Sequence, residues 1–195
     1  MTRVVVLIKD FDSAKQRLSP ALDPRRRRLL AVSMAVKALA AAGPAAIVVA
    51  GSPEAATLAA DRVKEVIRED HPAGQREAAR RGIDRALELG ADAVLIVSSD
   101  LPRVSGDAIR EMIEAGEKLG SPAVLAAPAL GRGGTNALFL SPPRVIDLHF
   151  GDDSLNKFEA DALSRSVPFH HFESEAFALD LDEPSDLEAA SFLDR

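Results

Sequence analysis

Short, continuous apolar runs recur along this chain, and each is followed by a segment long enough to form a helix. The clearest runs lie at residues 3–8, 45–50 and 93–97. A strand that is apolar on both faces must be covered on both faces, as in parallel sheets flanked by helices. Strands that alternate with helices therefore predict an α/β domain built on a mostly parallel sheet.

Capping and turn residues predict where the helices begin and end. Asp23-Pro24 suits a helix start and Gly43-Pro44 its end, while Ser105 and Gly120 bracket a second helix. The other expected elements are helices at 54–60 and 75–89, a short helix after residue 143, helices from near 153 and from 184, and strands at 63–67, 123–127, 137–140, 167–172 and 176–181. With no internal repeat or low-complexity linker, residues 1–195 are expected to form one three-layer domain.

Composition excludes several classes of protein. The chain has no cysteine, so a disulfide framework, a thiolate zinc site and a cysteine nucleophile are all excluded. No apolar run approaches the roughly 20 residues of a membrane span, and the N-terminus does not resemble a signal peptide. A net charge of −6 and an aromatic content of 4% argue against nucleic-acid binding. We therefore expect a cytoplasmic protein without membrane or nucleic-acid partners.

The charge is unevenly distributed. Residues 1–28 carry eight basic and three acidic side chains, a net charge of +5, whereas the other 167 residues carry −11. A small polyanion would be attracted to the N-terminal segment. Lys9, Lys15 and Arg17 follow the first expected strand, where a triphosphate would be met, and are candidate catalytic residues.

Acidic residues follow two other expected strands. Ligands of open α/β sheets bind beyond the carboxyl ends of the strands. Asp100 lies in the loop that follows an apolar strand, which suits a carboxylate that holds Mg²⁺ on a phosphate; a turn-capping role is the alternative. Asp180 and Asp182 alternate after a strand-like stretch, so both are expected on one side of the sheet. The alternative is an N-cap for the helix from Pro184, which Asp182 or Glu183 could supply.

Two glycine-containing turns are candidate anion sites. Residues 131–136 contain three glycines in four positions, which lets the backbone approach an anion closely. Residues 151–154 open a helix whose N-terminal amides, with the Ser154 hydroxyl, could receive a phosphate or carboxylate. Ordinary turns and a plain helix cap by Asp153 are the alternatives.

Motifs of several other enzyme classes are missing. The sequence has no G-x-x-x-x-G-K-[ST] loop, no G-x-G-x-x-G after the first strand and no G-x-S-x-G elbow. Its four histidines lack paired metal-ligand spacing, so we interpret them as structural or surface residues. A reaction whose nucleophile is already an anion needs no general base, and this sequence suits such a reaction.

Taken together, these segments resemble the 2-phospholactate and phosphoenolpyruvate guanylyltransferases of coenzyme F-420 biosynthesis. The resemblance spans nearly the whole chain. The run G-R-G-G-T-N followed by H-F-G-x-x-S is the most particular to this family, whereas S-D-L-P and D-x-D-x-P-x-D-L occur more widely in nucleotidyltransferases with a glycosyltransferase-A-like fold. The motifs are I-K-D-F-D-S-A-K-Q-R-L at 8–18, S-D-L-P at 99–102, G-R-G-G-T-N-A-L at 131–138, H-F-G-D-D-S at 149–154 and L-D-L-D-E-P-S-D-L at 179–187.

The resemblance implies a glycosyltransferase-A-like nucleotidyltransferase fold and a role for each candidate residue. Gly74 and Gln75 begin the stretch where family members read the nucleotide base. A small or amide residue is usual where Arg76 stands, so base recognition departs from the family pattern. The implied sites are Mg²⁺ on Asp100 and Asp182, with Asp180 a further candidate; the phosphorylated acid on Thr135, Gly151 and Ser154; the nucleotide on Ser52, Gly74 and Gln75; and catalysis by Lys9, Lys15, Arg17, Asp100 and Asp182.

The reaction implied is attack by a substrate phosphate on the α-phosphorus of GTP, with pyrophosphate leaving. The implied partners are GTP, a phosphorylated three-carbon acid and a downstream deazaflavin transferase that receives the product; whether the chain forms a homodimer is left open. The acid is phosphoenolpyruvate, 2-phospholactate or 3-phosphoglycerate. The stretch G-Q-x-x-A-A looks more like the bacterial members of the family, which favours phosphoenolpyruvate. Two alternatives stay open: a molybdopterin or sugar-phosphate nucleotidyltransferase of the same fold, and a non-catalytic nucleotide-binding domain.

Overall fold

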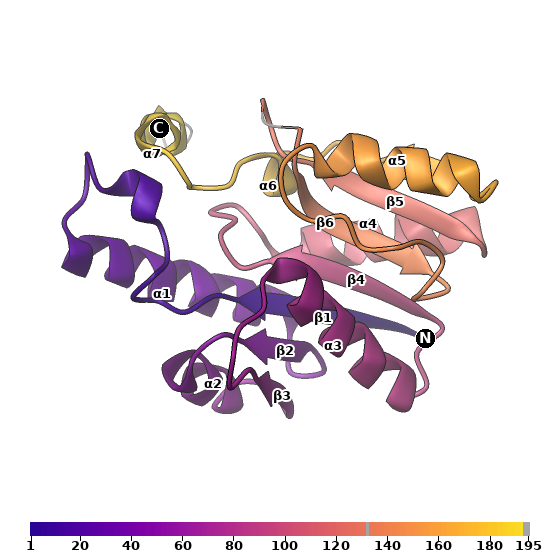
Figure 1. Cartoon of the computed structure of the whole chain (residues 1–195), viewed down its shortest axis with the longest axis horizontal. Coiled ribbons are helices and arrows are strands. Elements are labelled where there is room, and N and C mark those ends of the chain that lie inside the picture. The colour runs from indigo at the N-terminus through magenta and orange to yellow at the C-terminus, as the bar shows by residue number, and fades with distance from the viewer. Residues whose placement is uncertain (132, 193–195) are drawn as a thin grey trace.

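A seven-stranded sheet forms the centre of the molecule (Figure 1). The computed structural model describes residues 1–131 and 133–192, with side chains described up to residue 188. Across the sheet the strands are ordered β3-β2-β1-β4-β6-β5-β7. Their bounds are β1 (Thr2–Ile8), β2 (Ile47–Ala50), β3 (Glu65–Arg68), β4 (Ala93–Ser98), β5 (Ala123–Pro128), β6 (Thr135–Ser141) and β7 (Phe169–His171).

Most neighbouring strands are parallel, as the sequence predicts. Strands β3, β2, β1 and β4 run in one direction, β5 and β7 are parallel to each other, and β6 is antiparallel to both β4 and β5. In the ladders, Leu7 of β1 pairs with Val49 of β2 and with Ser98 of β4. These three strands therefore end at the same edge, which brings the loops that follow them together.

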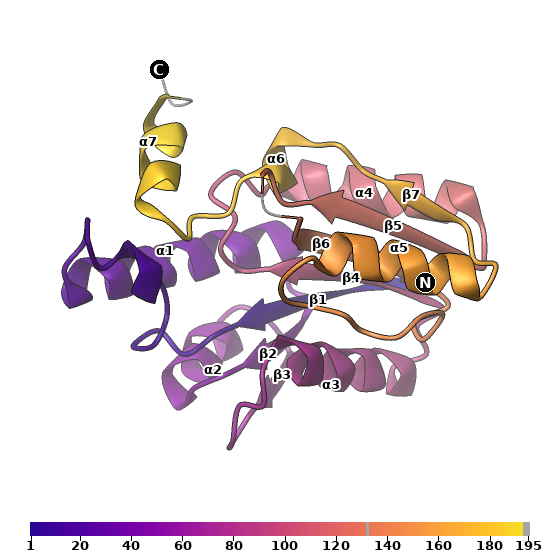
Figure 2. The same ribbon diagram turned by 45° about the horizontal axis from the view of Figure 1, so that its top comes forward.

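Helices cover both faces of the sheet, so the domain has the three layers expected (Figure 2). One face packs against α1 (Pro24–Ala42), α2 (Pro53–Ala60), α4 (Gly106–Leu119) and the short α6 (Glu175–Ala178). The other packs against α3 (Gln75–Glu88) and α5 (Ser154–Ser164). A 3₁₀ turn, η1 (Gln16–Leu18), precedes α1, and α7 (Pro184–Phe192) ends the described chain. None of the helices in the described ranges is long and apolar enough to cross a bilayer.

The capping residues act where the sequence predicts. The Asp23 carboxylate accepts the Arg26 N–H over 2.9 Å at the start of α1. The Ser105 hydroxyl accepts the Ala108 N–H over 3.2 Å at the start of α4, and Gly120 follows its end with a positive φ of 83°. Side chains that satisfy the free N–H groups of a first turn stabilise these helix starts.

Two expected elements are wrong. The segment predicted as a strand at 176–181 instead forms the single-turn helix α6, followed by irregular chain. The Ser174 hydroxyl accepts the Ala176 N–H over 3.3 Å, and one helical turn suffices to bury Phe177 completely. The short helix expected after residue 143 is only a turn, in which the Val145 N–H donates to the Pro142 carbonyl.

Candidate active site

Two adjoining cavities open at the edge where β1, β2 and β4 end. The larger has a volume of about 460 Å³ and the smaller about 240 Å³. The larger is flanked by β2, the β1–η1 loop and the start of α3, and the smaller by β6 and the loop before α5. The residues that line both are Lys9, Gln75, Ser98, Asp100 and Asp182.

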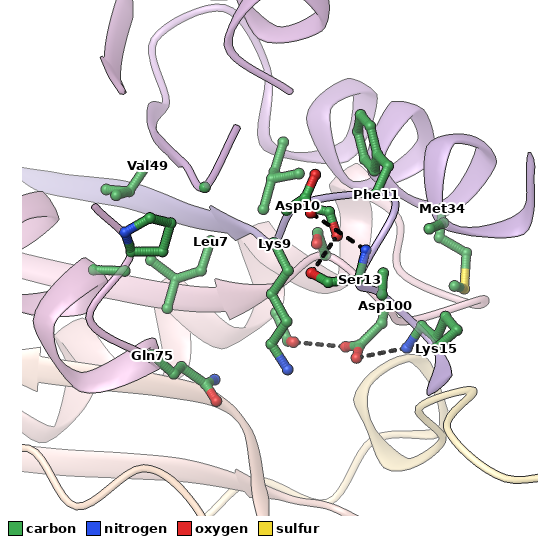
Figure 3. A pocket seen from close by; sticks show the side chains of 18 of the residues that line it. Leu7, Lys9, Asp10, Phe11, Ser13, Lys15, Met34, Val49, Gln75 and Asp100 are labelled. Atoms are coloured by element: carbon green, nitrogen blue, oxygen red, sulfur yellow. Dashed lines mark hydrogen bonds and ion pairs between the residues drawn. The ribbon is translucent and has the colours of Figure 1, made fainter. Parts of the chain in front are cut away.

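Asp100 lies where the two cavities join, just beyond the end of β4. Its carboxylate accepts a hydrogen bond from the Ser98 hydroxyl at 2.6 Å and forms an ion pair with Lys15 Nζ at 2.9 Å (Figure 3). Burial raises the pKa of Asp100, but Lys15, Ser98 and the nearby Lys9 outweigh it, so the net pKa is lowered. Asp100 is therefore an anion at neutral pH, as a cation ligand must be.

Lys15 is held in an uncommon backbone conformation. Its φ of 59° and ψ of 33° are left-handed, and its side chain is only 5% exposed. A bulky residue rarely adopts this conformation, and such local strain gathers at functional sites. The left-handed residue immediately precedes η1, and its ammonium group points at Asp100 (Figure 3).

Asp182 reaches the same rim from the far end of the chain. The Leu181 N–H donates to the Asp100 carbonyl over 3.2 Å, which fixes the D-L-D segment beside the S-D-L-P loop. Arg17 lies 3.2 Å from the Asp182 carboxylate. The expectation that Asp180 and Asp182 share a sheet face is wrong because this segment forms no strand; Asp180 lines the smaller cavity and Asp182 lines both.

The side chain that caps the segment before α7 is Asp186, a residue that sequence reasoning missed. Its Oδ2 accepts the backbone N–H groups of Asp182 at 2.8 Å and Glu183 at 2.6 Å. These bonds involve only the backbone of Asp182 and Glu183, so the alternative in which one of their side chains caps α7 stays a prediction. The acidic residue three positions after Glu183 was the available signal, since carboxylates commonly accept the free N–H groups at a helix start.

The residues expected to hold Mg²⁺ fit such an ion. Asp100 is ionised and supplies hard oxygen donors, and Asp182 lines the same two cavities. Within residues 1–131 and 133–192, no three His, Cys, Asp or Glu side chains are grouped to hold a metal by themselves. Mg²⁺ typically takes one or two carboxylates and completes its ligands with phosphates and water.

The expected acid-binding residues lie together in the smaller cavity. Thr135, Gly151 and Ser154 all line it, and the Ser154 hydroxyl donates to the Thr135 hydroxyl over 3.2 Å. The Leu155 N–H donates to the Gly133 carbonyl, which joins the glycine-rich turn to the start of α5. The Asp153 side chain makes no capping hydrogen bond. Arg132, within the glycine-rich turn, lies outside the described residues.

The expected nucleotide residues are only partly brought together. Gly74 and Gln75 line the larger cavity. Ser52 lines neither cavity: its hydroxyl accepts the Ala55 N–H over 3.2 Å as the N-cap of α2, and its neighbour Gly51 lines the cavity instead. Ser52 is therefore a helix cap here and not part of the cavity wall. Arg76 is exposed and lies outside both linings, so its departure from the family pattern leaves the cavity walls unchanged.

Glu69 also lines the larger cavity, and sequence reasoning missed it. Its side chain is 5% exposed, and burial raises its pKa, opposed by Arg81 and reinforced by Glu77. In the sequence it stands between Arg68 and Asp70, a context typical of a solvated loop, and no motif marks it.

Sequence comparison finds relatives over almost the whole chain. The family model described as "Guanylyl transferase CofC like" matches residues 2–192. A phosphoenolpyruvate guanylyltransferase of Sphaerobacter thermophilus is 35% identical over 192 residues, covering 96% of this chain and 91% of the relative. A 3-phospho-D-glycerate guanylyltransferase of Colwellia psychrerythraea is 28% identical, covering 98% and 92%. A 2-phospho-L-lactate guanylyltransferase of Methanocaldococcus fervens is 26% identical, covering 95% and 82%.

Solved structures share the fold. A nucleotidyl transferase from Methanothermobacter superposes with a TM-score of 0.69 at 20% identity, covering 100% of this chain and 98% of that one. At this identity the likeness concerns the fold alone, and it agrees with the nucleotidyltransferase architecture that the sequence motifs imply.

Proposed function

Since the chain belongs to the family of CofC-like guanylyl transferases, we propose that it transfers GMP from GTP to the phosphate of phosphoenolpyruvate. As a member of this family, the chain is a guanylyltransferase, and its family reaction belongs to coenzyme F-420 biosynthesis. The observation that carries the assignment of the site is the junction of two cavities at Asp100 and Asp182. Two substrates that react with each other must bind in cavities that join where the reacting atoms meet.

The larger cavity suits GTP and the smaller suits the acid. The volume of the larger cavity lies in the range of pockets that take whole cofactors. Lys9 and Lys15 line this cavity where phosphates would lie. Thr135, Gly151 and Ser154 offer hydroxyl and backbone donors to a phosphate or carboxylate in the smaller cavity. Lys9 lines both cavities, so its ammonium can neutralise both polyanions as they approach.

The chemistry requires positioning more than proton transfer. A phosphate monoester has its second pKa at about 6, so its oxygen is already nucleophilic at neutral pH. That oxygen forms a bond to the α-phosphorus of GTP, the bond from this phosphorus to the bridging oxygen breaks, and pyrophosphate leaves with the electron pair. Lys9 and Lys15 neutralise charge on the phosphates, while Arg17 holds Asp182.

We propose that Asp100 and Asp182 hold Mg²⁺. When bound there, the ion would neutralise phosphate charge and orient the triphosphate. Asp100 is kept ionised for this task by its Ser98 and Lys15 contacts, and Asp182 is held in place by Asp186 and Leu181.

Phosphoenolpyruvate is favoured over 2-phospholactate and 3-phosphoglycerate by the relatives. The relative from Sphaerobacter thermophilus, at 35% identity, is named for phosphoenolpyruvate, while those named for the other two acids are less similar. Pocket discrimination between acids of such similar size is worth only about 1–3 kcal/mol. The transfer of the product to a downstream deazaflavin transferase stays a prediction.

The test is pyrophosphate release from GTP and Mg²⁺ with each of the three acids. We expect release with all three or a subset, and the highest kcat/KM with phosphoenolpyruvate. A higher kcat/KM with another of the three acids would reassign the substrate within the family. Release only with CTP and a sugar phosphate would favour the other nucleotidyltransferase alternative, and GTP binding without turnover would favour the non-catalytic one.

A further inference from the structure

The wall of the larger cavity contains a buried carboxylate oxygen whose contacts leave it unsatisfied. Glu69 is 6% exposed, and its Oε1 accepts no hydrogen bond from the described residues. Burying a carboxylate oxygen without a donor is costly, so native structures rarely leave one without a hydrogen-bond partner. A ligand in the cavity would supply the missing donors.

The nearest cation does not satisfy this oxygen. Arg81 Nε lies 3.9 Å from Glu69 Oε1, beyond hydrogen-bonding distance, and donates instead to Glu77 at 3.3 Å. The Glu69 backbone is held firmly, because its N–H donates to the Ala50 carbonyl over 2.9 Å at the end of β2. The backbone of Glu69 is therefore anchored on the sheet edge, and its side chain lines the cavity with a buried Oε1 that lacks a donor.

The two ends of the larger cavity differ in charge and polarity. Near Asp100 lie the ammonium groups of Lys9 and Lys15, which attract a triphosphate (Figure 3). Glu69 follows β3, which is three strand positions from β4, or roughly 14 Å at ordinary strand spacing. The same cavity is lined with apolar surface from Leu7, Val49, Pro72 and Ala78. A nucleotide with its triphosphate at the lysines can therefore lay its base along this apolar wall, on the side of the cavity where Glu69 lies.

We propose that Glu69 is the residue that selects guanine, by accepting hydrogen bonds from its N1–H and 2-amino groups. This inference rests on the proposed use of GTP. An ionised carboxylate only accepts hydrogen bonds, and guanine alone of the common bases presents two adjacent donors on this edge. On the same edge, adenine presents an unprotonated N1 and a C–H at position 2. It would therefore donate no hydrogen bond to Glu69, and the lone pair of its N1 would face the carboxylate.

The role of Glu69 also explains why Arg76 can depart from the usual family residue. Arg76 lies on the exposed side of α3, outside the cavity wall, whereas Glu69 is inside it. Base selection by a carboxylate from the β3 side does not need a small or amide side chain at position 76.

The experiment compares binding of GTP, ITP and ATP by calorimetry in the presence of Mg²⁺. ITP keeps the N1–H of guanine but lacks the 2-amino group, so it removes one donor from the ligand alone. For the wild-type chain we expect GTP to bind on the order of 10-fold tighter than ITP and tighter still than ATP. Glu69→Gln, which puts an amide N–H₂ where an acceptor is needed, should weaken GTP binding on the order of 10- to 100-fold and bring the GTP-to-ITP ratio toward one.

Asp70→Asn is the matched control, because it makes the same acid-to-amide change one residue later. Asp70 is exposed, and its carboxylate forms an ion pair with Arg68 at 2.7 Å. It should leave the GTP-to-ITP ratio unchanged. If Glu69→Gln is too unstable to study, Glu69→Asp retracts the carboxylate by one methylene and should lower the ratio in the same direction.

An unchanged ratio in both Glu69 variants, or a wild-type chain that binds ITP as tightly as GTP, would overturn the inference. Either result leaves the proposed reaction standing if pyrophosphate is still released from GTP and phosphoenolpyruvate. Conversely, a ratio that depends on Glu69 in a protein that turns over no three-carbon acid would refute the proposed reaction and keep Glu69 as the guanine selector.

Discussion

The backbone N–H of Leu181 donates to the backbone carbonyl of Asp100 over 3.2 Å. This contact joins the loop after β4 to the segment before α7, so a carboxylate from each lines both cavities. Because the bond is between backbones, side-chain changes at Asp100 and Asp182 can test their chemistry while leaving the connection in place.

Asp186 positions Asp182, and its replacement should show this in the dependence on Mg²⁺. Asp186→Ala removes the acceptor of two backbone N–H groups, which should cost about 1 kcal/mol of unfolding free energy. We also expect turnover to fall on the order of 10-fold as Asp182 loses its fixed place. The Mg²⁺ concentration for half-maximal pyrophosphate release should rise.

Asp186→Asn keeps one acceptor oxygen and should restore part of the activity. Ser185→Ala, which changes an exposed side chain in the same turn, serves as the control. It should alter neither the unfolding free energy nor the Mg²⁺ dependence of pyrophosphate release. If Asp186→Ala lowered stability but left the Mg²⁺ dependence unchanged, Asp186 would be a helix cap alone.

Lys15→Met should destabilise the protein in a pH-dependent way. The folded pKa of Asp100 lies below its ordinary value of 3.8, so its ionisation contributes stability above that value, and this contribution is lost as the pH falls through the folded pKa. Without Lys15, burial dominates and raises the Asp100 pKa. The loss of unfolding free energy should then be on the order of 3 kcal/mol at pH 7 and should shrink below about pH 4.

Thermal unfolding of the wild-type chain and of Lys15→Met between pH 3 and pH 7 measures how the loss of stability depends on pH. Arg68→Met removes the exposed ion pair to Asp70, whose side chains are 56% and 72% exposed, and provides the control. Its effect should stay small across the range. A Lys15→Met effect that is equally large at pH 3 would contradict the assignment of the stabilisation to the Asp100 charge.

A pair of glycines in α4 should respond in opposite ways to alanine. A Cβ on Gly116 would lie 2.6 Å from ring atoms of the fully buried Phe139, whereas one on Gly106 would meet its nearest atom at 3.4 Å, at the end of the Arg110 side chain. Gly116→Ala should cost about 1–3 kcal/mol, and Gly106→Ala should be neutral or slightly stabilising because alanine favours helix. The denaturant concentration at the midpoint of unfolding measures the stability of each variant. Equal midpoints for the two variants would show that α4 is not held this close to β6.

Much of the fold could be predicted because its signals are local. Continuous apolar runs mark β1, β2 and β4, and cap residues such as Asp23 and Ser105 mark helix starts. The strand predicted over residues 176–181 failed because one buried residue, Phe177, satisfies either a strand or a single helical turn. Only the Ser174 cap and the packing around Phe177 decide between them.

The candidate site was predictable where residues lie within two positions of a strand end, as Lys9 and Asp100 do. It was not predictable where a role depends on distant contacts. Glu69 reads as a loop residue until β2 and α3 bury it, and the capping role of Asp186 depends on the path of the chain before α7. Ser52 shows the converse, since a polar residue after a strand satisfied its own helix instead of facing the cavity.

The most direct test of the site is the Mg²⁺-dependent release of pyrophosphate from GTP and phosphoenolpyruvate by a chain that carries both Asp100→Asn and Asp182→Asn. Asp107→Asn, which changes an exposed carboxylate on α4, is the control and should keep full activity. We predict a loss of at least about 1000-fold for the double variant, with thermal unfolding still cooperative, because two charges that hold the cation are removed without loss of volume. Turnover equal to that of the wild-type chain would contradict the claim that these two carboxylates form the reacting centre.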